Sequence, residues 1–325
     1  MPETNKRKIV FMGTSEFAVP ILKSLNDCYD VVLVVVSPDK PTGRKQAITP
    51  PPVKILANEL GLKVEQPTKL RGNEEFFNTL KKVNPEVIVV VAYGKILPAE
   101  IINLPEHGCI NVHGSILPKY RGPSPIQTAL INGEKETGIS FILMDLGMDT
   151  GDVIRKYSIN IESEDDFNSL SGKLSALSAE KVCKVVEQYV NGDTNLEMQE
   201  DDEATYCYKI TETMGRIQWS LSARAIANRI RAIGGKVGVY TFFDEKRLRI
   251  IEAEGVDSHC VKDNASISVG TVFQGVDPET NIKMVCVKCG KGRLILKKVQ
   301  LEGRQPMAIK DFVNGQQKFV GSVLS

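Results

Sequence analysis

An amide and an imidazole stand close together at the end of an apolar run, in the sequence INVHGSILPKYRGPSPI. Asn111 and His113 are two residues apart, so on a strand both side chains point to the same face. The next apolar run, GISFILMD, leads into LGMDTGD, and together they supply Asp145, Asp149 and Asp152. Neighbouring strands would bring one of these three carboxylates close to His113.

An amide, an imidazole and a carboxylate together suit acyl transfer to an amine. The carbonyl oxygen gains negative charge in the tetrahedral intermediate, and an amide N–H and an imidazolium stabilise that charge. A carboxylate holds the orientation and charge of the histidine and assists removal of the proton from the attacking amine. No GxSxG elbow presents a serine nucleophile, so direct transfer without a covalent enzyme intermediate is favoured. The alternative is that His113 makes only a structural hydrogen bond at the strand end.

The elements that must position these side chains alternate between strand and helix through the first half of the chain. Val/Ile-rich runs such as KIVFMG, DVVLVVVS and EVIVVVAYG are separated by helical segments such as EFAVPILKSL, PVKILANELG and EEFFNTLKKVN. This pattern predicts a Rossmann-like, doubly wound, mostly parallel sheet covered on both faces, with ligands beyond the carboxyl ends of the strands. The turn GTSEFA lacks the GxGxxG pattern and therefore does not indicate a dinucleotide.

A second domain is expected, because single cores stop growing well before 325 residues. The acidic passage QEDDEATY reads as the junction, which divides the chain into domains at 1–205 and 206–325. The second domain opens with the helical segment SARAIANRIRAIGG. Short strands with turn signals between them follow, such as VGVYTFF, IKMVCVKCG and GRLILKKVQLEG, and they predict a small barrel or sandwich.

The net charge of +1 conceals an asymmetry between these halves. Residues 1–205 carry 22 Lys and Arg against 29 Asp and Glu, whereas residues 206–325 carry 19 against 11. An acidic first half and a basic second half suggest that the second module faces a polyanion. The loop SPDKPTGRKQAITPPPVK adds Lys40, Arg44 and Lys45, and its length is typical of a functional or a flexible segment.

Other features favour an ordinary soluble protein without a metal. No apolar run approaches the ~18 residues of a membrane span, and the N-terminus lacks the pattern of a signal peptide. Seven scattered cysteines suit reduced cytosolic thiols better than a disulfide framework. Cys286 and Cys289 form a CxxC pair with no second Cys/His pair at zinc-site spacing, so no metal is expected.

One stretch of the chain is similar to the signature of the 10-formyltetrahydrofolate-dependent formyltransferases. It reads INVHGSILPKYRG.SPIQTALINGEKETGI...MD.GMDTGDV. The likeness runs nearly end to end. It takes in KIVFMGTSEFAVPIL, SPDKPTGR....TPPPVK, VVVAYGKILP and RIQWSLSARAIANRIRA, which resemble the members that act on initiator methionyl-tRNA. The resemblance implies formyl transfer from 10-formyltetrahydrofolate to that tRNA, a Rossmann-like catalytic domain and an OB-type C-terminal barrel.

The resemblance also assigns residues. The catalytic Asn, His and Asp fall on Asn111, His113 and Asp149, because Asp149 fills the place of the acid in the DTG context. The folate-contacting residues implied are Ser115, Ile116, Leu117, Pro118, Tyr93, Ile96 and Leu97. The tRNA-contacting residues implied are Lys40, Arg44, Lys45 and Lys209.

Two alternatives stay open at this point. A formyltransferase that acts on the amine of a sugar nucleotide or of a purine precursor would share the Asn/His/Asp core. A non-catalytic folate- or RNA-binding module is the alternative of a different class. The long basic loop and the basic second half favour tRNA, and we expect a cytoplasmic monomer.

Overall fold

The computed structural model describes residues 6–42, 47–256, 267–276 and 280–325. Its contacts divide the chain into two compact units, each of which is described by itself. The first comprises Met1–Pro125, Glu136–Ile161 and Asn168–Tyr208. The second comprises Ile126–Lys135, Glu162–Phe167 and Lys209–Ser325. Two short stretches that lie before the expected junction at 205/206 therefore pack with the second unit.

The first unit is built on a seven-stranded sheet with the order β5-β2-β1-β6-β7-β8-β9. β1, β2, β5, β6 and β7 are parallel, whereas β8 and β9 run antiparallel to their neighbours. The chain moves outward from β1 to β5 and then returns to β6, so the strand order reverses beside β1. The strand bounds are Lys8–Gly13, Asp30–Val35, Val64–Glu65, Val87–Val91, Cys109–His113, Glu136–Leu143 and Val153–Asn160.

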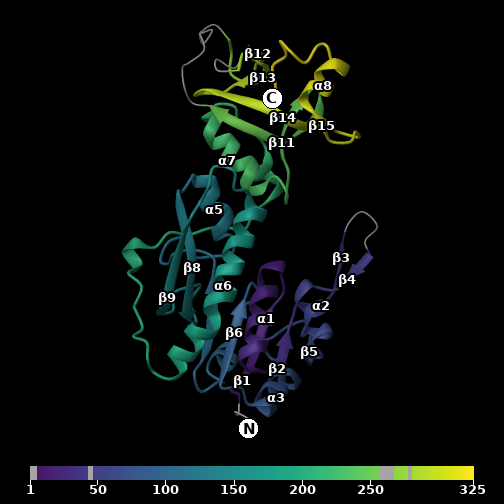
Figure 1. Ribbon diagram of the computed structural model, residues 1–325. Helices are drawn as coiled ribbons and strands as arrows, with labels where there is room; N and C mark the ends of the chain where they lie inside the picture. Colours follow the sequence, from purple (N-terminus) through teal and green to yellow (C-terminus); the bar gives the residue numbers. More distant parts are fainter. Residues whose placement is uncertain (1–5, 43–46, 257–266, 277–279) are drawn as a thin grey trace. The chain divides into compact units, whose positions relative to one another are not determined.

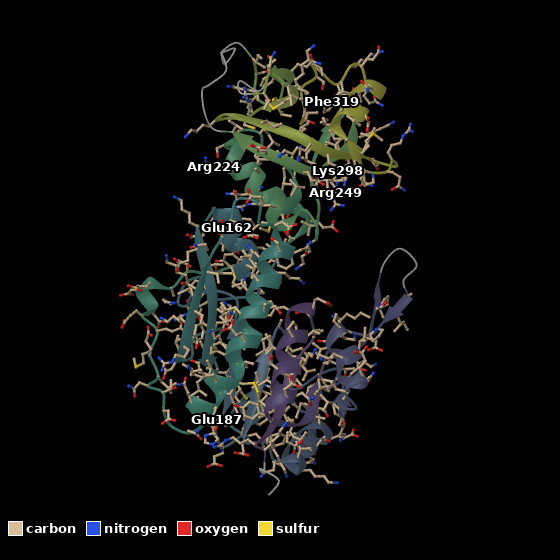
Figure 2. The ribbon with its side chains drawn as sticks, in the orientation of Figure 1. Glu162, Glu187, Arg224, Arg249, Lys298 and Phe319 are labelled. Atoms are coloured by element: carbon tan, nitrogen blue, oxygen red, sulfur yellow. A yellow bond between two sulfur atoms is a disulfide. The ribbon has the colours of Figure 1, made fainter. Side chains whose placement is uncertain are left out.

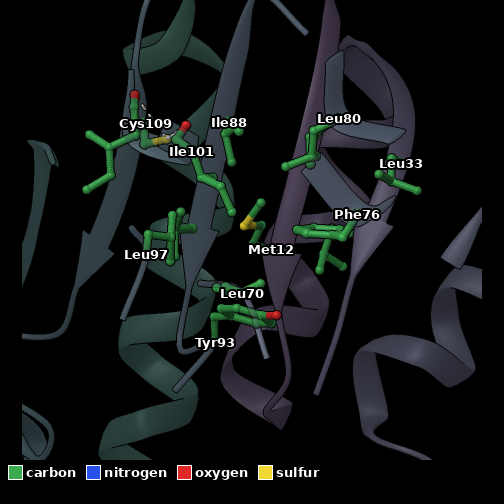
Figure 3. Close-up of a cluster of buried hydrophobic side chains, with 14 residues drawn as sticks. Met12, Leu33, Leu70, Phe76, Leu80, Ile88, Tyr93, Leu97, Ile101 and Cys109 are labelled. Carbon is green, nitrogen blue, oxygen red and sulfur yellow. Dashed lines mark hydrogen bonds between the residues drawn. The ribbon is translucent and has the colours of Figure 1, made fainter. Parts of the chain in front are cut away.

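Helices flank this sheet (Figure 1). One face packs against α3, which begins after the Asn73 cap and is followed by Asn84 in the left-handed conformation. The buried cluster on this face joins Met12, Leu33 and Ile88 of the strands to side chains of α3, α4 and the preceding loops (Figure 3). The helices of the first unit are η1 (Glu16–Ala18), α1 (Val19–Cys28), α2 (Pro52–Glu59), α3 (Glu74–Val83), α4 (Ala99–Ile102), α6 (Phe167–Val190) and η2 (Asp201–Glu203).

α1 and α6 are held against one another by specific contacts. A disulfide joins Cys28 at the end of α1 to Cys183 of α6. The Tyr29 hydroxyl donates to the carbonyl oxygen of Cys183 at 2.8 Å, and the Ser175 hydroxyl donates to that of Phe17 at 2.7 Å. The expectation that all cysteines are reduced is therefore wrong for this pair. Sequence spacing could not reveal it, because 155 residues separate the two sulfur atoms.

The long basic loop contains regular structure that the sequence did not indicate. β3 (Lys40–Thr42) pairs with β4 (Ala47–Thr49) as a small antiparallel hairpin. At its base, Lys54 of α2 binds the Asp39 carboxylate at 2.8 Å, and Gln66 donates to the same carboxylate at 2.7 Å. These contacts anchor the start of the hairpin to the sheet domain.

The second unit is a barrel of antiparallel strands. Its strands follow the order β10-β11-β14-β13-β12, and β15 pairs with β14. The last residues of the chain close the sheet, because the Val272 N–H of β12 donates to Ser322 and the Phe242 N–H of β10 donates to Ser325. The strand bounds are Val239–Phe243, Lys246–Val256, Val272–Val276, Lys283–Lys288, Arg293–Leu301 and Met307–Ala308.

Aromatic packing fills one end of this barrel. Phe243, Phe312 and Phe319 form three edge-on ring pairs, with centroids 4.9 to 6.3 Å apart. α7 begins at the Ser222 cap, whose hydroxyl accepts from the Ala225 N–H at 3.2 Å. The helices of this unit are α5 (Pro125–Asn132), η3 (Glu212–Gly215), α7 (Ala223–Ile233) and α8 (Ile309–Gly315).

Candidate active site

The candidate site is centred on the carboxyl end of β7. Asn111 is half-buried, and the His113 side chain is 6% exposed. The strand alternation places both side chains on one face, as their spacing predicts. The residues of β7 between and before them, Ile110 and Val112, are buried and keep the strand within the sheet.

A carboxylate reaches these two side chains from the loop that follows β8. Asp149 Oδ1 accepts a hydrogen bond from Asn111 Nδ2 at 3.2 Å, and Asp149 Oδ2 lies 3.5 Å from His113 Nδ1. Asp149 Oδ2 also accepts from the backbone N–H of Gly122 at 2.8 Å. The amide, the imidazole and the carboxylate are therefore close enough to contact one small ligand.

The carboxylate arrives by a route that differs from the expected one. β8 is antiparallel to β7, with His113 opposite Ser140 and Ile110 opposite Leu143. The end of β8 thus lies beside the start of β7, and two neighbouring carboxyl ends do not meet there. The loop between β8 and β9 instead carries Asp149 back to Asn111 and His113.

The shape of this loop explains which of its acids reaches the site. Asp145 accepts hydrogen bonds from the Thr150 hydroxyl at 2.7 Å and from the Gly147 N–H at 3.0 Å, so it braces the loop internally. Asp149 has a φ of 57°, in the left-handed region that Asp tolerates better than most residues. A Cβ on Gly151 would lie 1.8 Å from the Leu143 carbonyl oxygen, so only glycine fits there.

Both ring nitrogens of His113 face acceptors. Nε2 lies 2.9 Å from the carbonyl oxygen of Tyr120, which can only accept, so Nε2 carries a proton. Nδ1 faces the Asp149 carboxylate. This pair of acceptors fixes the orientation of the imidazole ring.

The predicted folate segment is the loop that follows β7. Ser115 and Leu117 are buried, and Ile116 and Pro118 are half-buried. The Ser140 hydroxyl links this loop to β8, because it donates to the Ser115 carbonyl at 2.8 Å and accepts from the Leu117 N–H at 3.0 Å. The loop is therefore held in one shape beside Asn111 and His113.

The remaining predicted folate residues lie in the loop after β6 and differ in their exposure to solvent. Tyr93 and Leu97 belong to the buried cluster of Figure 3, and burial raises the pKa of Tyr93 to about 12. Ile96 lies between them and is 86% exposed. Of these three side chains, Ile96 is the one that solvent reaches fully.

The predicted tRNA contacts are only partly described. Lys40 is exposed at the start of the hairpin in the first unit, and Lys209 is exposed at the start of the main segment of the second. Arg44 and Lys45 lie outside the described residues.

The segment that follows α6, residues 191–208, is called the connecting segment. Sequence reasoning missed its residues near Asp149. Gln199 donates to the Asp149 carbonyl at 2.9 Å and accepts from Arg121 Nε at 3.0 Å. The Cys207 thiol lies beside Tyr120 and Ser124, and burial raises its pKa. A neutral, buried thiol is a poor nucleophile, which agrees with direct transfer. The sequence signal for Gln199 is weak, because it stands in a polar passage that reads as a linker.

This fold and site define a two-domain group-transfer enzyme of the α/β class. Residues 6–186 match the family model described as formyl transferase, and residues 209–317 match the one described as formyl transferase, C-terminal domain. The chain belongs to the formyl transferase family.

Similar proteins cover nearly the whole chain. The methionyl-tRNA formyltransferase of Caldanaerobacter subterraneus subsp. tengcongensis is 47% identical, over 98% of this chain and 99% of its own. The enzyme of that name from Caldicellulosiruptor saccharolyticus is 46% identical, over the same shares of the two chains.

Solved structures at lower identity show the same fold. An N-formyltransferase from Helicobacter canadensis superimposes with a TM-score of 0.63 at 19% identity, over 89% of this chain and 98% of its own. HypX from Aquifex aeolicus superimposes with a TM-score of 0.61 at 14% identity, over 97% of this chain and 50% of its own.

Proposed function

We propose that this chain transfers a formyl group from 10-formyltetrahydrofolate to the α-amino group of initiator methionyl-tRNA, for translation initiation. The observation that carries the proposal is the end-to-end similarity to relatives named for that reaction. The contact of Asn111, His113 and Asp149 supports it, because these groups suit formyl transfer to an amine.

The chemistry is a direct transfer between two nitrogens. The deprotonated methionyl amine attacks the formyl carbon on N10 of the folate, and a tetrahedral intermediate forms. When the intermediate collapses, the C–N10 bond breaks, the formamide forms and the proton lost by the amine ends on N10. An α-amino group has a pKa of about 7.7, so a sizeable fraction is already nucleophilic at neutral pH. The enzyme therefore supplies positioning and charge stabilisation more than a strong base.

Each of the three side chains has a distinct part in this step. Asn111 uses one N–H on Asp149 and offers the other to the developing oxyanion. His113 stabilises the oxyanion by its positive charge; a direct hydrogen bond requires one ring nitrogen to leave its present protein acceptor. Asp149 sustains that charge and assists proton removal from the amine.

The two substrates occupy different parts of the chain in this proposal. The folate binds along the loops that contain residues 93–97 and 115–118, and these loops adjoin the strands that carry the site. The tRNA binds the sequence segment that contains Lys40, Arg44 and Lys45, the segment of Lys209, and the basic barrel. The functional division is then a catalytic domain at 1–205 and a tRNA-binding domain at 206–325. We infer that the protein works as a monomer in the cytoplasm. No helix among the described residues is long and apolar enough to cross a membrane.

A formylation assay with charged tRNAs tests the proposed function. Purified protein, labelled 10-formyltetrahydrofolate and methionyl-tRNA of the initiator or elongator type are mixed, and labelled formyl-methionyl-tRNA is measured. We expect rapid formylation of the initiator tRNA and at least about 10-fold slower formylation of the elongator, since the tRNA body supplies the discrimination. Formylation of a sugar-nucleotide amine or a purine-precursor amine in its place would show another acceptor. Binding of folate without turnover on any of these amines would indicate a non-catalytic module.

A further inference from the structure

The segment after α6 pairs with the first residue of β9 through the backbones of Glu197 and Val153, and its Gln199 side chain contacts the Asp149 loop. Gln199 Nε2 donates one hydrogen bond to the carbonyl oxygen of Asp149 at 2.9 Å and another to that of Gly151 at 2.7 Å. We propose that Gln199 is a positioning residue for the transfer step, which holds the Asp149 carboxylate against His113 and Asn111. The inference rests on the proposed function, because it assigns Asp149 a part in that reaction.

The backbone of the loop is the reason such a residue is needed. Asp149 adopts a φ of 57°, which costs free energy for a residue other than glycine. The direction of its carboxylate depends on the backbone that follows it as well as on the backbone before it. Gln199 binds the carbonyls of Asp149 and Gly151, so it restrains the backbone on both sides of Thr150.

The other end of the Gln199 amide is fixed as well. Gln199 Oε1 accepts from Arg121 Nε at 3.0 Å, and Arg121 Nη1 donates to the Asp201 carboxylate at 2.8 Å. Because arginine can only donate and the two carbonyls can only accept, the amide has one satisfactory orientation. The Arg121 side chain is 1% exposed, so its position is strongly constrained.

Arg121 also connects Gln199 to the residue that binds the Asp149 carboxylate. Arg121 precedes Gly122, whose N–H donates to Asp149 Oδ2 at 2.8 Å. The Arg121 backbone also pairs with the connecting segment, through the Thr205 carbonyl and the Cys207 N–H, both at 2.8 Å. A Cβ on Gly122 would lie 2.4 Å from the Cys207 carbonyl oxygen, and its φ is 121°, so this approach requires glycine. Gln199 thus binds the main chain of Asp149, and Gly122 binds its carboxylate.

The Gln199→Glu variant tests the hydrogen-bond donation of the glutamine separately from its role as an acceptor. The carboxylate still accepts from Arg121, but at neutral pH it cannot donate to the Asp149 and Gly151 carbonyls and repels them. Gln199→Met keeps the length of the side chain, removes all its hydrogen bonds and adds no charge. Gln188→Glu, on α6 in the same unit, makes the same chemical change at a half-buried position and serves as the control.

The experiment measures kcat and KM for formylation, the dissociation constant of 10-formyltetrahydrofolate, the melting temperature, and the ring-proton NMR signals of the histidines. The chain has three histidines, so the His113 signal is identified by its loss in His113→Asn. We expect kcat to fall about 10- to 100-fold in both Gln199 variants, because small misplacements of reacting groups carry costs of this size. Folate affinity should stay within about twofold of wild type, the His113 signal should move, and Gln188→Glu should change none of these quantities.

Two results would overturn the inference. A kcat within about twofold of wild type in both Gln199 variants, with only the melting temperature lowered, would make Gln199 a structural brace. An unmoved His113 signal in both variants would show that Asp149 keeps its place without Gln199. If the wild-type protein forms no formyl-methionyl-tRNA in the same assay, the proposed function fails, which is a separate outcome. If one Gln199 variant does not fold, the other decides.

Discussion

At the scale of single residues, the candidate site depends on an imidazole ring held between two acceptors. His113 lies between the Tyr120 carbonyl and the Asp149 carboxylate, and it is almost completely buried. Turning the ring would give up its contacts with these two oxygen atoms. In the proposed reaction, a ring nitrogen that donates to the oxyanion must first leave one of these acceptors.

His113→Ala should reduce turnover by at least about 100-fold, because it removes one stabiliser of the oxyanion. Single-turnover formylation of initiator methionyl-tRNA measures this loss, with the melting temperature recorded in parallel. His107→Ala, at a half-buried position in the loop before β7, is the matched control and should keep normal turnover. A near-normal single-turnover rate in folded His113→Ala would remove His113 from the mechanism.

At the scale of elements, a loop in the first unit and the C-terminal residues in the second bring separate strands into contact. The loop between β8 and β9 brings Asp149 to β7 even though β8 is antiparallel to it. In the second unit the C-terminal residues close the barrel between β10 and β12. The Thr241 hydroxyl of β10 also donates to the Ser325 carbonyl, at 3.0 Å.

Leu324→Ala should destabilise the barrel, because Leu324 is 3% exposed in the segment that closes it. Large-to-small changes at such sites cost about 2 to 5 kcal/mol of unfolding free energy. Val323→Ala, at a position 59% exposed, should change that free energy by less than about 0.5 kcal/mol. Denaturant unfolding, together with amide exchange of β10 and β12, measures both changes. Equal effects of the two substitutions would show that the tail does not close the barrel in solution.

At the scale of the whole molecule, charge is divided unequally along the chain. Basic side chains of the second unit include Arg224 of α7 and Lys298 of β14 (Figure 2). Some are paired, since Lys297 binds Glu254 at 2.8 Å and Lys298 lies 3.5 Å from Glu252. Exposed lysines and arginines in the second unit outside those pairs include Lys209, Arg216, Lys236, Lys246, Lys283, Lys291, Arg304, Lys310 and Lys318.

The affinity for tRNA should therefore fall steeply as salt rises. Each phosphate that the protein neutralises contributes roughly −0.7 to −0.9 to the slope of log affinity against log salt concentration. Binding of initiator methionyl-tRNA measured between low and moderate salt gives this slope. Replacing both Lys246 and Lys291 by Ala should make it less steep, whereas a flat dependence in the wild type would argue against the basic barrel as the tRNA-binding face.

The sequence alone determined most of the local structure and the kinds of side chain at the site. Hydrophobic periodicity predicts β1, β2, β6 and β7, the helices between them and the barrel strands, because it reports which face of each element is buried. The pair Asn111 and His113 follows from their spacing on one strand, and the resemblance selects Asp149 from three acids.

The tertiary structure alone decided how distant parts meet. The antiparallel direction of β8 and β9, the disulfide between Cys28 and Cys183, the closing of the barrel by the last residues and the contact of Gln199 with the Asp149 loop are all of this kind. Apart from the pairing of β8 with β9, each joins residues far apart in sequence. Local propensity carries no information about such partners, because their stabilisation arises only when the packed fold brings them into contact.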